Sequence, residues 1–219
     1  MGGRGSSSGG GGNLGNSSGG SVSIVSQTDV WSLRHEKGNE SFVDQINGSI
    51  LDIQRDFGGV MDTVQTVTAS ELSGMERTQV LGFYGRNGLS VNKNYTNEGK
   101  MNAAYDEAVR QGFHPSRGTK TGTEAVTYHE MGHALTDHLA PKVGANNIDA
   151  ASKKIVDNAY KSSGGKGGTI KFARGISQYA TQSNAECVAE AVADFYCNGA
   201  KAAKASIAIV GELKRVNKL

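Results

Sequence analysis

One segment of this chain, TEAVTYHEMGHALTDHL at residues 123–139, restricts the fold more than any other part of the sequence. Its composition suits a helix, which we predict over about residues 122–139, and apolar residues before and after the histidines can anchor that helix in a core. His129 and His133 are four positions apart, so a helix places both imidazoles on the same face. The fold must therefore bury one side of this helix while the histidines face a cleft.

A helix that carries His129, Glu130 and His133 in this order has the donor groups of a metal site. Two imidazoles at this spacing can ligate one Zn²⁺, and the carboxylate between them reaches the metal-bound water rather than the metal. A random chain of this composition would contain about 0.006 such HExxH matches. We therefore predict His129 and His133 as zinc ligands and Glu130 as the general base. The alternative is a pair of histidines on a solvated helix face.

The segment SNAECVAEAVADFY at residues 183–196 is the best source of a third ligand. We predict a helix over about residues 183–197, in which Glu186, Glu190 and Asp194 form an acidic row with one turn between members. One carboxylate of this row can reach the metal, and a second can orient a ligand histidine by accepting its free N–H. The alternative is a solvated acidic face, but the interleaved alanines favour close packing against another helix.

Together, the HExxH helix and the segment ISQYATQSNAECVAEAV at residues 176–192 resemble the gluzincin metallopeptidases. They are most similar to the metalloprotease domain of anthrax toxin lethal factor and its relatives. In that family a segment of the form SYxxxxxxExxAEAF carries the third ligand, and here Tyr179 precedes Glu186 by the same interval. The resemblance implies that Glu186 is the third zinc ligand and that Glu190 supports a ligand from behind. It also implies that Tyr179 donates its hydroxyl to the oxyanion of the tetrahedral intermediate.

The resemblance covers residues 89–197 and departs from the family at Cys187 and Val188, where aromatic residues are usual. The substrate pocket is therefore expected to differ in shape, while zinc binding is retained. The modules by which toxins of this family dock to receptors and enter cells do not fit in 219 residues, so toxin delivery is not inherited. The opening MGGRGSSSGG is also similar to that of small metallopeptidases encoded in phage and prophage genomes.

Four further side chains each have two interpretations. Asp137 lies four positions after His133, as in a thermolysin-like pattern in which the aspartate supports a ligand histidine; a capping or solvated aspartate is the alternative. His138 points away from the ligand face and is expected to be a surface or packed residue. His114 either lines the cleft or is an ordinary loop histidine, and Cys187 is expected to be a buried thiol.

The rest of the sequence predicts an α+β chain. Residues 1–21 hold ten glycines and six serines, so we expect a disordered tail followed by one zincin-like metallopeptidase domain over residues 22–219. Strands gather early and helices late, which favours a small mixed or antiparallel sheet, the HExxH helix and a C-terminal helical part. We expect strands at 60–67, 79–84 and 89–94, the last two forming a hairpin, and further helices at 40–57, 97–112, 147–162, 183–197 and 200–217.

The composition argues against several partners. A formal net charge of +2 gives no electrostatic case for nucleic acid or an anionic membrane. No apolar run approaches the roughly 18 residues of a membrane span. The first thirty residues lack the apolar region of a signal peptide, so we expect a cytoplasmic protein of the producing cell or a component of a phage virion. Cys187 and Cys197 lie about 15 Å apart on one predicted helix, which is too far for a disulfide between them.

These features favour a zinc metallopeptidase that hydrolyses a peptide or protein substrate. One Zn²⁺ held by His129, His133 and Glu186 would carry the water that Glu130 deprotonates. We expect the strand at 89–94 to hold the substrate along a sheet edge. The alternative is a catalytically silent zinc-binding structural or adaptor protein, for instance in a phage particle, and a secreted toxin effector is a third possibility. The sequence leaves the substrate, the cleavage specificity and the oligomeric state open.

Overall fold

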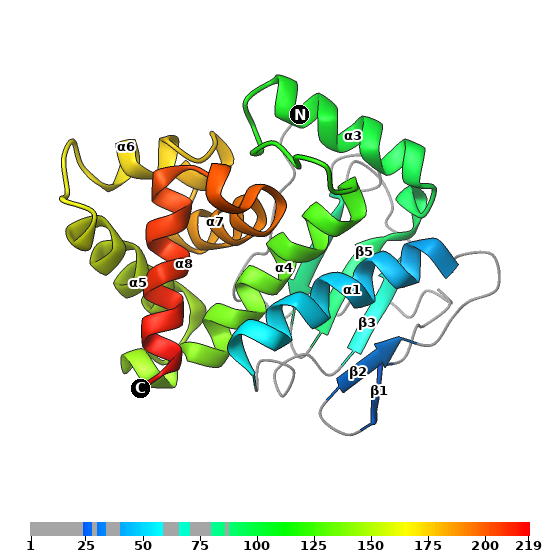
Figure 1. Cartoon of the computed structure of the whole chain (residues 1–219), viewed down its shortest axis with the longest axis horizontal. Helices are drawn as coiled ribbons and strands as arrows, with labels where there is room; N and C mark the ends of the chain where they lie inside the picture. Colours follow the sequence, from blue (N-terminus) through cyan, green and yellow to red (C-terminus); the bar gives the residue numbers. More distant parts are fainter. Residues whose placement is uncertain (1–23, 28–29, 34–39, 59–65, 71–79, 86–87) are drawn as a thin grey trace.

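The computed structural model describes residues 24–27, 30–33, 40–58, 66–70, 80–85 and 88–219. The Gly/Ser-rich residues 1–21 and residues 60–65 of a predicted strand lie outside these ranges. Helices predominate among the described residues, and short strands form two small sheets (Figure 1). The predicted α+β class is therefore confirmed.

The strands form a hairpin and a mixed sheet. Strands β1 (Ile24–Gln27) and β2 (Val30–Leu33) pair antiparallel. The second sheet has the order β3-β5-β4, with β3 (Thr66–Ser70) parallel to β5 (Gly88–Asn92) and β4 (Gly82–Gly85) antiparallel to it. The predicted hairpin of residues 79–84 and 89–94 is present as β4 and β5.

The order of the second sheet corrects one prediction. Residues 89–94 were expected to form an edge strand, but β5 pairs with β3 on one side and with β4 on the other. Its backbone groups are thus used within the sheet, and it has no edge to offer a peptide. Among the described residues, β4 and β3 are the edge strands of this sheet.

The helices lie close to their predicted positions. Helices α1 and α4 have the predicted bounds, α3, α5 and α7 differ by one or two residues at their ends, and α8 begins four residues later than expected. The short helix α6 and several 3₁₀ turns have no clear apolar period, so the sequence does not predict them. The elements are α1 (Glu40–Phe57), α3 (Glu98–Arg110), α4 (Gly122–Leu139), α5 (Ile148–Ser162), α6 (Thr169–Arg174), α7 (Asn184–Asn198), α8 (Lys204–Asn217), η2 (Lys93–Tyr95), η3 (Pro141–Val143), η4 (Tyr179–Thr181) and η5 (Gly199–Lys201).

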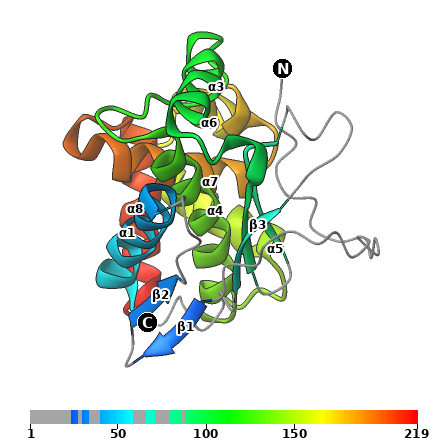
Figure 2. The same cartoon turned by 90° about the vertical axis from the view of Figure 1, so that its right-hand side faces the viewer.

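Helix α4 is the central element of the fold. It runs between α1 on one side and the mixed sheet on the other, and most of its residues are buried (Figure 2). A capping box starts it: the Thr121 side chain accepts from the backbone N–H of Glu124, and the Glu124 carboxylate accepts from the backbone N–H of Thr121 at 2.7 Å. A helix buried all round cannot shift easily, so its side chains are held in fixed positions.

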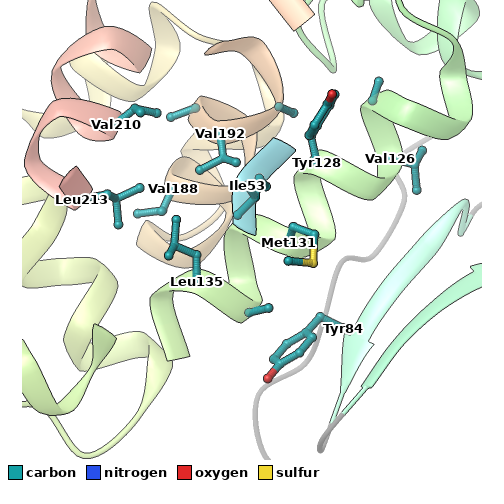
Figure 3. Close-up of a cluster of buried hydrophobic side chains, with 14 of the residues drawn as sticks. Ile53, Tyr84, Val126, Tyr128, Met131, Leu135, Val188, Val192, Val210 and Leu213 are labelled. Carbon is teal, nitrogen blue, oxygen red and sulfur yellow. The ribbon is translucent and has the colours of Figure 1, made fainter. Parts of the chain in front are cut away.

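Helices α4 and α7 approach each other closely at Gly132. A Cβ atom at this position would lie 2.7 Å from the Cα of Ala189, which is shorter than real Cβ contacts, so glycine is required here. Leu135 of α4 and Val188 and Val192 of α7 extend the contact into the hydrophobic core (Figure 3). This close packing places the two helices that carry the predicted metal ligands side by side.

The described helices also bear on the predictions about membrane spans and cysteines. None of them is long and apolar enough to cross a membrane. Cys187 is buried and Cys197 is partly buried, both lie on α7, and neither forms a disulfide.

Candidate metal centre

The three residues of the HExxH motif converge in the interior. His129, Glu130 and His133 are all buried on α4, and each offers a ligand atom within 4.8 Å of the others. The helical spacing of four residues turns both imidazoles to the same side, as predicted. This buried group could hold a metal ion.

Glu186, in the first turn of α7, brings a carboxylate oxygen to the same place. Its Oε2 lies 3.2 Å from His129 Nε2 and 3.5 Å from His133 Nε2. Yet Glu186 Oε2, Glu130 Oε2 and both ring nitrogens of His133 make no hydrogen bond of good geometry to the described residues. Buried polar atoms without partners are costly, so their convergence suits a group from outside the chain. Imidazole nitrogens and a carboxylate oxygen are donors that a divalent transition metal accepts.

Glu190 supports His129 from behind. Its Oε1 lies 2.8 Å from His129 Nδ1, and its Oε2 accepts a hydrogen bond from the Ser177 hydroxyl at 2.7 Å. An ionised carboxylate only accepts, so His129 Nδ1 is the donor, and Nε2, which faces Glu186, becomes a metal ligand once it has lost its proton. Glu190 therefore contacts the ring nitrogen of His129 that does not face Glu186.

Electrostatics within the cluster favour ionised glutamates in the metal-free chain. Burial raises the pKa of the Glu186 carboxyl, but the nearby imidazoles of His129 and His133 outweigh it and hold this pKa well below its usual range. Burial likewise raises the pKa of the Glu190 carboxyl, but His114 and His129 outweigh it and lower this pKa to about 2. Burial lowers the pKa of His129, but Glu186, Glu190 and Glu130 raise it well above the usual value. A metal ion binding here would displace the His129 proton.

Glu130 faces the edge strand β4. Burial raises the pKa of its carboxyl, and the neighbouring histidines offset only part of this effect. The backbone N–H of Tyr84 hydrogen-bonds to the same carboxyl, while Oε2 has no hydrogen-bond partner within the described ranges. Glu130 is therefore fixed at one end and available to an outside partner at the other.

Tyr179 lies beside the ligand histidine. It is buried in the turn η4, and its ring stacks on that of His129 with centroids 5.9 Å apart. Its backbone N–H donates to the carbonyl of Phe113 at 3.0 Å, and the Phe113 ring packs against the tyrosine ring at 4.8 Å. The structure thus brings Tyr179 next to His129 from a different element.

Asp137 differs from the expectation that it supports His133. Its Oδ2 accepts a hydrogen bond from the Tyr84 hydroxyl at 3.1 Å, while His133 Nδ1 has no partner among the described residues. The Asp137 carboxylate lies one turn further along α4 than His133, and it bonds to Tyr84 of β4 rather than to the His133 imidazole. Asp137 therefore links α4 to β4 in this structure.

Two residues of the site were not predicted as site residues. His114 Nδ1 lies 2.9 Å from Glu190 Oε1, although the residues are 76 positions apart, and Ser177 bonds to the other oxygen of that carboxylate. Both lie in loops, where no periodicity marks a position. The other two weighed residues behave as expected, since His138 is partly buried and burial raises the pKa of the Cys187 thiol to about 12.

Comparisons with known proteins add no relative: no protein-family model, curated protein or solved structure matches this chain. The candidate metal centre therefore rests on the geometry of these residues, and the likeness to gluzincins on the two sequence motifs.

Proposed function

We propose that this chain is a zinc-dependent metallopeptidase of the gluzincin type with a zincin-like fold. One observation carries the proposal. His129, His133 and Glu186 converge from two tightly packed helices, and several of their buried polar atoms have no hydrogen-bond partner among the described residues. A site that served only the packing of these helices would satisfy such atoms within the chain.

The donor set favours zinc. His129 Nε2, His133 Nε2 and Glu186 Oε2 would hold one Zn²⁺, because two imidazoles and a carboxylate that leave a coordination position open are typical of catalytic zinc. When bound, the ion supplies a polarised carbonyl and a water of lowered pKa. A structural zinc site would be closed by four protein ligands and would have no use for the neighbouring Glu130.

Glu130 is the proposed general base. Its Oε2 would take the proton of the attacking water and return it to the leaving amine nitrogen. The hydrogen bond from Tyr84 holds the carboxyl in place, and burial raises its pKa towards the range in which proton transfer in both directions is efficient. The side chain lies between the two ligands in sequence and next to the edge strand in space.

Tyr179 and β4 would hold the substrate. The Tyr179 ring lies against the ligand His129, so its hydroxyl is the proposed donor to the oxyanion formed from the scissile carbonyl. The strand β4 is an edge of the sheet and contacts Glu130 through Tyr84. An extended peptide paired with β4 would lie along the base, and this replaces the role first expected for residues 89–94.

Glu130→Gln tests the function, because it preserves the shape of the side chain and removes the base. We expect this variant to bind zinc like the wild type and to cleave a mixed peptide library roughly 10²–10⁴-fold more slowly, as followed by mass spectrometry. Glu107→Gln, on the exposed face of α3, is the matched control and should cleave normally. Cleavage by the wild type should stop with a chelator and return with Zn²⁺.

Two outcomes would overturn this function. Full activity of Glu130→Gln would exclude Glu130 as the base. A zinc-loaded wild type that cleaves no member of the library would favour a zinc-binding structural or adaptor protein.

A further inference from the structure

One oxygen atom of Glu190 serves two histidines. Its Oε1 lies 2.8 Å from His129 Nδ1 and 2.9 Å from His114 Nδ1, and the side chain of Glu190 is almost completely buried. The other oxygen, Oε2, accepts a hydrogen bond from the hydroxyl of Ser177. Because an ionised carboxylate only accepts, both imidazoles must donate from Nδ1. The carboxylate is thus held at three points from three separate segments.

His114 is itself held firmly in its loop. Its ring stacks on Tyr105 of α3, with centroids 5.4 Å apart and an interplanar angle of 11°, and it meets Tyr179 edge-on at 5.3 Å. The loop is tied to the segment before η4, since Gln178 N–H donates to the carbonyl of Gly112 at 2.9 Å. The side chain of His114 is only 14% exposed. A hydrogen bond from so constrained a donor fixes the acceptor in turn.

We propose that His114 is a positioning residue of the metal centre. By donating from Nδ1 to Glu190 Oε1, it holds the carboxylate at the place from which the carboxylate orients His129. Without this contact, Glu190 keeps only Ser177 and His129 as partners and can turn about its side-chain bonds, so the ligand imidazole loses its fixed direction. The inference rests on the metal site of the proposed function, but it does not require peptide hydrolysis.

The affinity of the full-length chain for Zn²⁺, measured by competition with a chromophoric chelator, tests this role. His114→Phe keeps an aromatic ring against Tyr105 and removes the donor, and we expect zinc to bind about tenfold more weakly, the lower end of the range for partners of metal ligands. His114→Asn places an amide nitrogen near the position of Nδ1 and should restore an affinity close to that of the wild type. His138→Asn removes a histidine outside the cluster and should have no effect.

A double-mutant cycle shows whether His114 acts through Glu190. Glu190→Gln should weaken zinc binding by itself, and His114→Phe should weaken it no further in that background. Equal effects of His114→Phe in both backgrounds would overturn the inference. So would unchanged affinity in His114→Phe, or equal loss in His114→Phe and His114→Asn.

A measurement on the wild type covers the case in which a variant does not fold. Nitrogen-15 NMR of the zinc-loaded chain, labelled at histidine, should show a proton on Nδ1 of both His114 and His129; a His114 ring protonated only at Nε2 would contradict the proposal. The proposed peptidase activity can fail independently. A chain that cleaves nothing but loses zinc affinity in His114→Phe would support the positioning role and not the activity. A wild type that binds no zinc would overturn both.

Discussion

The two ends of helix α7 carry buried acids in different surroundings. Near its start, Glu186 Oε2 makes no hydrogen bond of good geometry to the described residues and faces two imidazole nitrogens. Near its end, Asp194 accepts from the Asn198 amide at 2.9 Å, the Ala203 N–H at 2.8 Å and the Ser206 hydroxyl at 2.6 Å. The two acids belong to one acidic row, and both are buried.

This difference in hydrogen bonding distinguishes a candidate metal site from a purely structural contact. Both carboxylate oxygens of Asp194 accept hydrogen bonds from the chain. These bonds tie the end of α7 to the residue that caps α8 and to the first turn of α8. Glu186 Oε2 lies near the two imidazoles but makes no hydrogen bond of good geometry to the described residues. Both acids are buried, so it is hydrogen-bond satisfaction that points to the start of α7 as the place for an outside group.

The largest expected effect is on zinc affinity. Glu186→Gln removes a proposed ligand, and we expect zinc to bind more than about 100-fold more weakly, beyond the range for outer partners of a metal ligand. Asp194→Asn is the matched variant at the other end and should bind zinc like the wild type. Chelator competition measures both. Equal losses in the two variants would remove the distinction between the regions.

The next effect is on stability. Asp194→Ala removes three hydrogen bonds to a charged group, so we expect the free energy of unfolding to fall by about 3 kcal/mol or more. Urea unfolding in the presence of a chelator measures this without a metal contribution. Any folded fraction should still bind zinc with normal affinity. Full stability with loss of zinc binding would instead place Asp194 in the site.

A smaller effect is expected from the spacing of the helices. Gly132→Ala would bring a Cβ within 2.7 Å of Ala189 Cα, and we expect a loss of about 1–3 kcal/mol through overpacking. Gly211→Ala in α8 is the matched control, since nothing lies within 4 Å of its Cβ position, and it should raise stability by up to about 1 kcal/mol. Urea unfolding compares them. A neutral Gly132→Ala would show that α4 and α7 need not pack so closely.

The smallest effect should be the pH dependence of the metal-free chain. The raised pKa of His129 contributes stability that is present below about pH 6.5 and is lost as pH rises, and the raised pKa of Glu130 acts in the same direction. The lowered pKa values of Glu186 and Glu190 contribute stability above about pH 4.5 that is lost on acidification. Stability should therefore be greatest near pH 5.

Zinc should change the alkaline side of this profile. The ion binds deprotonated imidazole, so the zinc-loaded chain should not lose stability above about pH 6.5 as the metal-free chain does. Urea unfolding at a series of pH values, with chelator and with zinc, gives the comparison. A metal-free chain whose stability rises steadily with pH would contradict the arrangement of charges at the start of α7.

The sequence predicts the helical part of the site better than the loops and the sheet. Apolar and alanine spacing predicts α4 and α7, and the four-residue intervals then place Glu186 and Glu190 on one face. His114 and Ser177 have no such pattern, because their contacts depend on how distant loops close over the helices. The edge position of β4 depends on β3 pairing with β5, and a hairpin motif cannot reveal a third strand. Asp137 was misjudged because a strand residue, Tyr84, competes for its carboxylate.

The most direct test of the central claim is the zinc content of the purified full-length chain after equilibration with Zn²⁺ and dialysis, measured by elemental analysis. If α4 and α7 form one metal site, the wild type and Asp194→Asn should each retain one zinc per chain, and His133→Ala and Glu186→Ala should retain almost none. A folded wild type without zinc, or full zinc content in both ligand variants, would contradict the claim.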